Sequence, residues 1–270
     1  MIGAGSLGSF ITAELLKKDV SVKVLTRDDS KAEWDAVKRS GATIVKVDYS
    51  DEKSLQDALT GIQVVVSTIS FFGLGAQIDM AKAAKAAGVQ LFVPAEFGVE
   101  ISDGMSSVKM EVKDVLKELQ LPYALFHPGF FADLFHVFFR YKYAEGRMTI
   151  VGKGETAFSA TSRHDIGRFV AHVLTTAAPA ELAWRTFRFE GDRLTLHEVA
   201  ARAERKLGTT IEITYLDFDE VKKNYDTDFF AFLTTVVEDG RAASGSPEEA
   251  QATVSKYFPD WNPAKFDEFI

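Results

Sequence analysis

The chain contains no cysteine among its 270 residues. Disulfides, thiolate zinc sites and cysteine nucleophiles are therefore excluded. No stretch approaches the roughly 18 uninterrupted apolar residues that a membrane span requires. The N-terminus also lacks a basic segment ahead of an apolar one, so we expect no secretory signal. The cytoplasm is the expected location.

Positive charge is scarce as well. The 31 lysines and arginines are outnumbered by 39 aspartates and glutamates, which gives a formal net charge of −8. Nucleic acids and anionic membranes bind basic surfaces, so we expect neither as a partner. None of the 5 histidines stands in a recognisable metal-ligand spacing with a carboxylate, and no metal is expected.

A glycine-rich turn opens the chain, with the sequence G-x-G-x-x-G at residues 3–8. A helix-like pattern follows at 10–18 and a strand-like one at 21–25. Glycines let the main chain approach a pyrophosphate, and the start of the next helix offers N–H donors. The motif alone is weak, but this order of elements predicts a dinucleotide-binding unit. The expected cofactor contacts are Gly3, Gly5, Ser6, Leu7 and Gly8.

Only Met1 and Ile2 precede the first glycine, so the first strand of the expected sheet looks truncated. That strand is central in a doubly wound sheet, and its loss would expose the edges of both neighbours. Either the recorded start lies too far downstream or the chain is shortened, and the sequence leaves both alternatives open.

Short apolar runs then alternate with helical patterns, which predicts an α/β fold with a doubly wound parallel sheet. The predicted strands are 21–25, 43–47, 64–67, 90–93 and 123–127, and the predicted helices are 31–39, 54–59, 76–87 and 107–119. After Phe126 this rhythm changes. We expect a nucleotide-binding domain at 1–127 and a smaller α/β substrate-binding part at 128–270, interleaved with the first.

Candidate cofactor ligands follow the predicted strands, because ligands bind at the carboxyl ends of such sheets. Arg27 stands where an acidic residue would bind the ribose of NAD, so it favours the 2′-phosphate of NADPH over NADH, with Lys31 as a second cation. The alternative is a solvated loop arginine. Ser67 and Thr68 stand at the end of the predicted strand 64–67, and Glu96 and Phe97 follow the predicted strand 90–93.

Several segments together resemble the isoflavone reductase-like group of the NmrA-like, atypical short-chain dehydrogenase superfamily. They are Val64–Thr68, Gln77, Phe92–Gly98, Lys109, Leu121–Tyr123, Asp165–Gly167 and Trp261–Phe269. The resemblance covers essentially the whole chain. It implies a Rossmann-type domain, NADPH as cofactor, and hydride delivery to phenolic or other conjugated substrates.

The resemblance also implies that Lys109 is the general acid/base, contacting cofactor and substrate. Burial and the like charge of Lys113, one helical turn on, would make its proton easier to lose. The alternative is an exposed helix lysine. Two features depart from the family pattern: the glycine loop is one residue shorter, and Ala95 replaces the usual serine. Met105 stands where ordinary short-chain dehydrogenases carry tyrosine, which argues against alcohol oxidation by their mechanism.

Phenylalanine is unusually frequent, with 22 in the chain. Many cluster just after the predicted domain boundary, where they could form either an aromatic-lined substrate pocket or ordinary core. The expected substrate contacts are Phe97, His127, Gly129, Phe130, Phe131 and Phe135.

Three functions remain open. The leading one is an NADPH-dependent reductase of phenolic, conjugated or other aromatic small molecules. The second is an NmrA-like regulator that binds NAD(P), reports redox state and docks to a protein partner without turnover. The third is a shortened chain that binds neither coenzyme.

Overall fold

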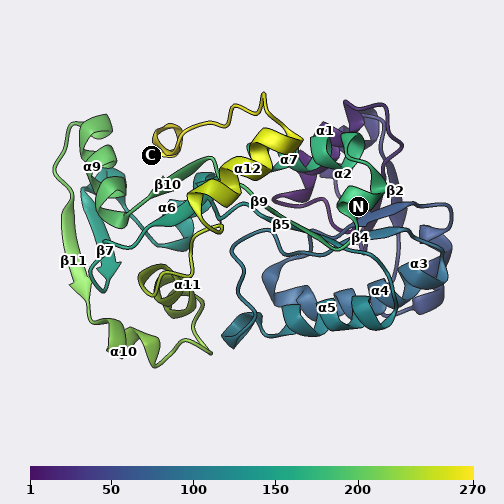
Figure 1. Cartoon of the computed structure of the whole chain (residues 1–270), viewed down its shortest axis with the longest axis horizontal. Coiled ribbons are helices and arrows are strands. Elements are labelled where there is room, and N and C mark those ends of the chain that lie inside the picture. Colours follow the sequence, from purple (N-terminus) through teal and green to yellow (C-terminus); the bar gives the residue numbers. More distant parts are fainter. The chain divides into compact units, whose positions relative to one another are not determined.

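The computed structural model describes the backbone of residues 1–270 and every side chain except that of Glu33 (Figure 1). The chain divides into two compact units. Unit 1 comprises Met1–Phe97, Val108–Phe126 and Ile166–Phe187, and unit 2 comprises Gly98–Ser107, His127–Asp165 and Arg188–Ile270. The expected α/β fold class is confirmed.

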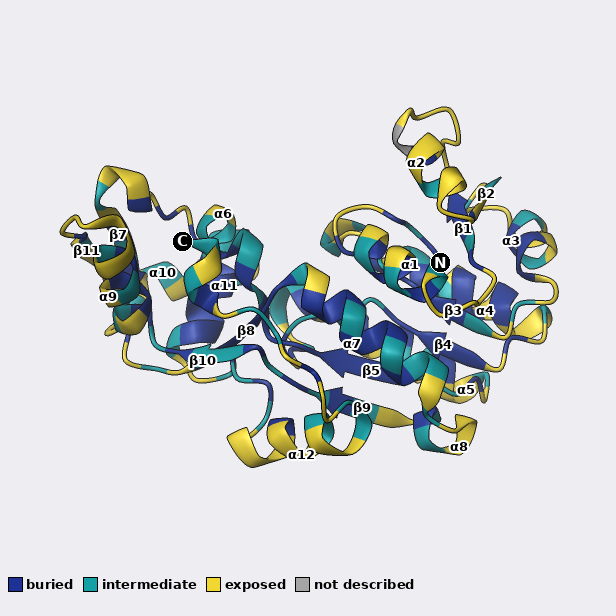
Figure 2. Cartoon of the chain, turned by 90° about the horizontal axis from the view of Figure 1, so that it is seen from above, coloured by how far each residue is buried: buried dark blue, intermediate teal, exposed yellow. Residues whose placement is uncertain are grey.

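Unit 1 is built on a mainly parallel arrangement of short strands: β1 (Lys23–Thr26), β2 (Thr43–Lys46), β3 (Val64–Val66), β4 (Leu91–Val93), β5 (Ala124–His127) and β9 (Arg185–Arg188). β1 pairs with β2 and β3 with β4, both in parallel. A parallel bridge from Phe92 to Tyr123 connects β4 to the start of β5, and β5 pairs with β9. β4 and β5 are buried throughout, as expected for central parallel strands (Figure 2).

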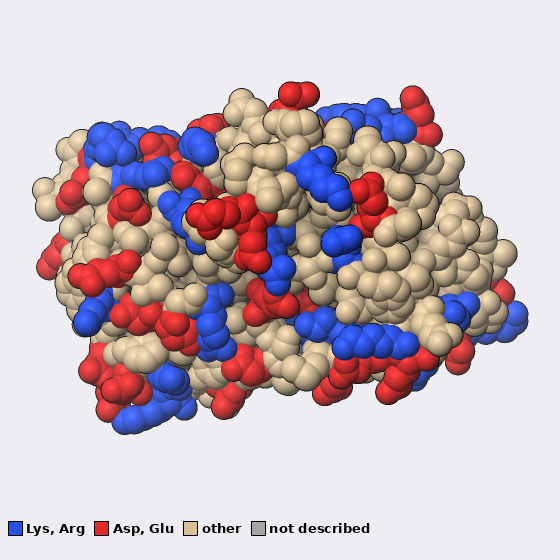
Figure 3. All heavy atoms as spheres, in the orientation of Figure 1, with Lys and Arg blue, Asp and Glu red and all other residues tan. Residues whose placement is uncertain are grey.

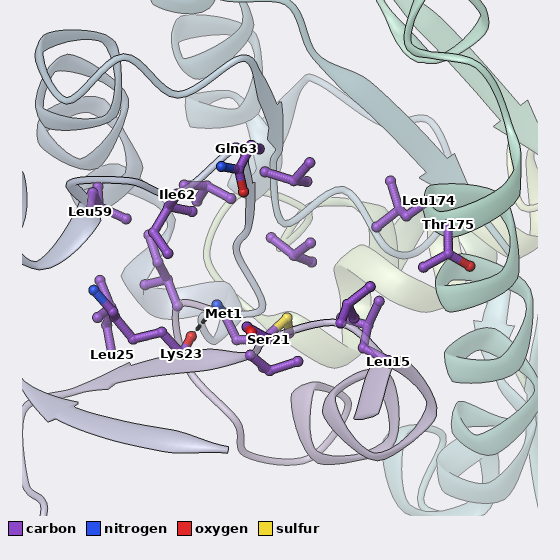
Figure 4. A pocket seen from close by; sticks show the side chains of 16 residues that line it. Met1, Leu15, Ser21, Lys23, Leu25, Leu59, Ile62, Gln63, Leu174 and Thr175 are labelled. Carbon is purple, nitrogen blue, oxygen red and sulfur yellow. Dashed lines mark hydrogen bonds between the residues drawn. The ribbon is translucent and has the colours of Figure 1, made fainter. Parts of the chain in front are cut away.

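The gap between β1 and β3 is bridged by Ile2, which forms parallel bridges to Leu25 and to Ser67. Its backbone N–H donates to the carbonyl of Val66 at 2.8 Å. Beside it lies a pocket of about 190 Å³ lined mostly by apolar side chains of both neighbouring strands (Figure 4). Ile2 thus lies between β1 and β3, next to this pocket.

Helices surround these strands: α1 (Gly8–Leu16), α2 (Glu33–Arg39), α3 (Glu52–Leu59), the 3₁₀ helix η1 (Phe71–Ala76), α4 (Gln77–Ala86), α5 (Val108–Glu118), α7 (Arg163–Thr176, of which unit 1 holds the part from Ile166) and α8 (Pro179–Leu182). α4 packs against α3 and α5. The core between these helices and the strands includes Leu55, Met80, Phe92 and Leu116, none more than 1% exposed.

Unit 2 contains two small sheets. β10 (Asp192–Leu194), β8 (Phe158–Thr161) and β6 (Phe130–Phe131) form one, and β11 (Glu212–Leu216) pairs in parallel with β7 (Arg147–Val151) in the other. Its helices are η2 (Gly104–Ser106), η3 (Ala132–Leu134), α6 (Phe135–Phe138), η4 (Tyr143–Glu145), α9 (Leu196–Leu207), α10 (Phe218–Lys222), α11 (Phe229–Glu238), α12 (Pro247–Tyr257) and η5 (Phe266–Phe269). Thr195 and Glu198 form a reciprocal capping box at the start of α9.

Aromatic side chains fill the core of unit 2. Phe135 is fully buried, and its ring stacks on Phe139 at 4.2 Å and on Phe158 at 4.7 Å between centroids. Phe266 packs edge-on against it at 5.3 Å. Much of the phenylalanine excess after residue 127 therefore builds a hydrophobic core.

Candidate active site

The glycine loop is held tightly against the end of β3. The Thr68 hydroxyl donates to the carbonyl of Gly3 at 2.7 Å, and Gly3 has a φ of +79°. A Cβ added to Gly8 would lie 2.3 Å from Thr68 Oγ1 and 2.5 Å from the Gly3 carbonyl oxygen. Gly3 and Gly8 are therefore required by the loop's own geometry.

Gly5 stands in contrast, because a Cβ added there would meet no atom within 4 Å. Gly5 and Ser6 are exposed, whereas the Leu7 side chain is buried, so Leu7 can offer a ligand only its backbone. α1 begins at Gly8, and its N-cap residue Leu7 makes no side-chain capping hydrogen bond. The loop thus presents an open backbone surface at a helix N-terminus, which fits the diphosphate of a dinucleotide.

Arg27 follows β1 and is exposed, with its guanidinium 5.9 Å from the centroid of the Tyr49 ring. Its acidic neighbour Asp28 is engaged locally, because Ser30 donates to the Asp28 carboxylate from its hydroxyl at 2.6 Å and from its backbone at 3.0 Å. These bonds lower the pKa of Asp28. Lys31 is exposed in the same loop. The two cations at this strand end suit a phosphate group.

At the end of β3, Ser67 is fully buried and its hydroxyl finds no hydrogen-bond partner among the described residues. Its backbone N–H donates to the carbonyl of Val93 at 2.8 Å. Thr68 donates from its backbone to Ile2 at 2.9 Å, in addition to its side-chain bond to the glycine loop. Thr68 therefore has a structural function that the sequence does not reveal.

Unit 1 contains a cluster of ionisable side chains, one carboxylate and two amines, that is largely shielded from solvent. Glu96 Oε2 lies 3.2 Å from Lys109 Nζ, and Glu96 Oε1 lies 3.5 Å from Lys113 Nζ. The side chain of Glu96 is 2% exposed, that of Lys109 10% and that of Lys113 14%. Lys109 and Lys113 lie one turn apart on the same face of α5. The expected burial of Lys109 is thus observed, and the exposed alternative is not.

A buried amide fixes the loop that carries Glu96. Gln77, 1% exposed at the start of α4, accepts from the backbone N–H of Ala95 at 2.7 Å and donates to the carbonyl of Leu74 at 3.3 Å. Sequence reasoning named Gln77 only within the family resemblance and missed this contact. The signal was weak, because an isolated glutamine before a helix has many possible functions.

Phe97 ends a row of three stacked rings. Its ring lies 6.2 Å from Phe126 at 17°, and Phe126 lies 4.8 Å from Phe187 at 14°. Phe97 is half-buried, whereas the other two rings lie in the interior of unit 1. Phe97 therefore offers an aromatic edge or face next to the residue that carries the buried carboxylate.

The remaining expected substrate contacts lie in unit 2. His127 is 1% exposed, and its carbonyl accepts from Phe189 N at 3.2 Å and from the Ser244 hydroxyl. Gly129 has a φ of +78°, and a Cβ there would lie 2.2 Å from the carbonyl oxygen of Ser159, so the fold itself requires this glycine.

The three phenylalanines differ in exposure. Phe131 is half-buried, whereas Phe130 is 7% exposed and Phe135 fully buried, both within the aromatic core. Of these rings, only that of Phe131 has substantial surface for direct contact with a ligand. The other two can support such a surface from behind.

In the described part of the chain, no helix is long and apolar enough to cross a membrane, and no group of three or more His, Asp or Glu side chains could hold a metal ion. On the face drawn in Figure 3, acidic and basic side chains are interspersed.

The strand order and the glycine loop define a dinucleotide-binding α/β fold of the doubly wound kind. The sequence model of the NmrA-like family matches residues 1–270, and the chain belongs to that family. The resemblance read from the sequence is thereby confirmed.

Three known proteins illustrate the relationship. A phenylcoumaran benzylic ether reductase of Pinus taeda is 27% identical over 260 residues, covering 87% of this chain and 82% of the relative. An isoflavone reductase homolog of Solanum tuberosum is 27% identical over 242 residues, covering 82% and 78%. The solved binary complex of leucoanthocyanidin reductase with NADPH from Vitis vinifera superposes with a TM-score of 0.85 at 22% identity, covering 99% of this chain and 96% of that one.

Proposed function

We propose that the protein is a cytoplasmic NADPH-dependent reductase that transfers hydride to a conjugated or benzylic carbon of a phenolic or other aromatic small molecule. The observation that carries this proposal is the buried Glu96–Lys109 pair, which lies in the same unit as the open glycine loop. The names of the similar proteins, reductases of aromatic compounds, agree with this class of reaction.

The cofactor would be held by the residues that follow the strands of unit 1. The backbone of Gly3, Gly5, Ser6, Leu7 and Gly8 suits the diphosphate, because N–H groups at a helix start favour an anion. Arg27 and Lys31 suit the 2′-phosphate that distinguishes NADPH from NADH. Ser67, Thr68 and Phe97 would contact the remainder of the dinucleotide. When bound, NADPH would supply the hydride.

Lys109 would donate the proton that the reduction requires. Hydride addition to a conjugated carbon breaks a double bond and moves its electron pair onto the conjugated oxygen, whereas hydride displacement at a benzylic ether carbon breaks the C–O bond and leaves the electron pair on the departing oxygen. An ammonium group within hydrogen-bond reach can neutralise either oxygen by donating a proton. Glu96 lies 3.2 Å from this amine and forms an ion pair with it. Within unit 1, Phe97 would provide aromatic surface for the substrate. The expected contacts of unit 2, which are His127, Gly129, Phe130, Phe131 and Phe135, stay predictions from the sequence.

Calorimetric titration with NADPH and with NADH tests the cofactor proposal, and an NADPH-oxidation screen against phenolic and enone compounds tests the reaction. We expect NADPH to bind more tightly than NADH and at least one conjugated aromatic compound to be reduced. Tight binding without oxidation of any compound, together with a co-purifying protein, would instead favour the redox-sensing alternative. Failure to bind either coenzyme would contradict both.

A further inference from the structure

An acidic residue lies next to the expected phosphate site. Asp28 follows Arg27 directly, and a carboxylate repels a phosphate. The backbone of Asp28 closes a tight turn: its N–H donates to Thr26 Oγ1 at 3.2 Å, and the Thr26 hydroxyl donates to its carbonyl at 3.1 Å. Its carboxylate accepts the two hydrogen bonds from Ser30. Asp28 therefore organises the backbone around Arg27.

A buried tryptophan of α2 holds the same turn. Trp34 is 4% exposed, and its indole N–H donates to the Asp28 carbonyl at 2.6 Å. This carbonyl thus accepts from the Thr26 hydroxyl and from the indole. These bonds fix the Arg27 backbone independently of a ligand. A charged side chain on a fixed backbone loses less conformational freedom on binding than one on a mobile loop.

The Arg27 side chain also has a support. Its guanidinium lies 5.9 Å from the centroid of the Tyr49 ring, and the Tyr49 hydroxyl donates to the carbonyl of Leu25 at 3.0 Å. The ring is thereby bonded to β1, the strand that Arg27 follows. A guanidinium beside an aromatic ring is further restricted in its orientation.

Another cation lies beside this turn on the neighbouring strand. Lys46 is the exposed last residue of β2 and the register partner of Thr26 in the parallel pair β1–β2. Because side chains alternate along a strand, residues paired in this way project from the same face of the sheet. The Ser30 hydrogen bonds lower the pKa of Asp28 most, and the charges of Lys31 and Lys46 lower it further. The charge of Lys46 therefore acts on Asp28.

The charges of the loop itself cancel. Arg27 and Lys31 are positive, and Asp28 and Asp29 are negative, so the formal charge of residues 27–31 is zero. A phosphate monoester carries about −1.5 to −2 charge at neutral pH and is attracted by a net positive site. Lys46 supplies one further positive charge from outside the loop.

We propose that Lys46 is a coenzyme-selectivity residue, which offsets the charge of Asp28 and attracts the 2′-phosphate, and that Trp34 is a positioning residue, which holds the Arg27 backbone through Asp28. This inference rests on the proposed use of NADPH. It adds Lys46 to Arg27 and Lys31 as a cation of the phosphate site, and it makes an aspartate compatible with that site.

The test of Lys46 is calorimetric titration with two ligands that differ only in the 2′-phosphate, adenosine 2′,5′-bisphosphate and adenosine 5′-monophosphate. We expect the wild type to bind the bisphosphate more tightly. Lys46→Met should weaken the bisphosphate by about threefold to tenfold and leave the monophosphate unchanged. This difference should shrink in 1 M salt, where exposed charges are screened. Lys38→Met, at an exposed lysine of α2, is the matched control and should change neither affinity.

The test of Trp34 is ¹⁵N relaxation of the ligand-free protein. Trp34→Phe keeps an aromatic ring and removes the indole N–H. We expect the backbone order parameters of residues 27–30 to fall from about 0.85 toward 0.6, and the affinity for the bisphosphate to fall while that for the monophosphate changes little. Thr26→Val removes the other donor to the same carbonyl and should act in the same direction. Trp184→Phe, at an exposed tryptophan of unit 1, is the matched control.

Each part of the proposal has a result that would overturn it. Equal losses for the two adenosine phosphates in Lys46→Met, or no loss for either, would remove the selectivity function of Lys46. Unchanged order parameters in Trp34→Phe would remove the positioning function of Trp34. If Trp34→Phe does not fold, Thr26→Val decides that part by the same measurement.

The inference and the proposed function fail separately. A loss confined to the bisphosphate in Lys46→Met, in a protein that reduces no aromatic compound, would leave the phosphate site standing and remove the reductase function. Reduction of an aromatic compound with NADH, together with equal wild-type affinity for the two adenosine phosphates, would remove the phosphate site and leave the reductase reaction.

Discussion

The amino group of Met1 donates a hydrogen bond to the carbonyl of Lys23 at 2.7 Å, which holds this amino group inside unit 1. Burial, and to a smaller extent the charge of Lys23, lower the pKa of this amine from 8.0 to about 5. Between about pH 5 and pH 8, the unfolded chain therefore binds more protons than the folded chain.

The consequence is a pH-dependent stability. Above pH 8 the amine is neutral in the folded and the unfolded chain, and the free energy of unfolding is highest. As the pH falls toward 5, only the unfolded chain takes up the proton, so the free energy of unfolding decreases by about 1.4 kcal/mol per pH unit and on the order of 4 kcal/mol in total. Urea unfolding at pH 8 and pH 5.5 measures it, and N-terminal acetylation is the control that removes the titrating group. Equal pH dependence in the free and the acetylated chain would contradict the buried amine.

The second prediction concerns the pocket beside Ile2. It is lined by apolar side chains of β1 and β3, so a short apolar strand fused ahead of Met1 should fill it and hydrogen-bond to both edges. We expect a Tm several degrees higher, because one or two kcal/mol shifts the midpoint of a domain of this size by about that amount. A glycine-serine extension of the same length is the control. Equal Tm values for the two extensions would show that the pocket does not accept a strand.

Two glycines of the same loop are expected to respond differently to alanine. Gly8→Ala would press a Cβ against Thr68 Oγ1 and the Gly3 carbonyl, which should cost about 1–3 kcal/mol in stability. Gly5→Ala has open space in the protein, so its stability should change little while NADPH binding weakens. Thermal unfolding and calorimetry of both variants check this. Unchanged NADPH affinity in Gly5→Ala would place the diphosphate elsewhere.

Cofactor selectivity is expected to depend on Arg27. Replacing it with alanine removes charge-assisted hydrogen bonds to a 2′-phosphate, each of which contributes about 1.5–3 kcal/mol. Arg27→Ala should therefore weaken NADPH binding by at least tenfold and leave NADH affinity nearly unchanged. Arg39→Ala, at the exposed end of α2, serves as the control. An equal loss for both coenzymes would refute the phosphate contact.

The order of elements in unit 1 could be predicted from the sequence because each element carries a local signal. The strand predicted at 64–67 is β3 at Val64–Val66, and the helix predicted at 107–119 is α5 at Val108–Glu118. Apolar runs, helical periodicity and flanking glycines determine such elements within a few residues. The largest boundary shifts are two residues, as at β1, which starts at Lys23 and not at Ser21, and at α1, which spans Gly8–Leu16 and not 10–18.

Contacts between distant residues could not be predicted in the same way. Gln77 and Ala95 lie 18 positions apart, and Thr68 and Gly3 lie 65 apart, and both bonds depend on how β3, β4 and α4 pack. The aromatic residues show the same limit. Phe131 and Phe135 carry the same side chain within a few positions, yet one is half-buried and the other fully enclosed by Phe139 and Phe158.

The central claim is that Lys109 donates the proton in a reductive reaction. The most direct test is the kinetics of Lys109→Met with an aromatic compound that the wild type reduces. Methionine keeps the length and the apolar stem of the side chain while removing the amine. We predict that kcat falls by about 10²–10⁴-fold, the usual contribution of a positioned acid or base, while the Kd for NADPH changes little. Turnover that stays within a few-fold of the wild type would contradict the account.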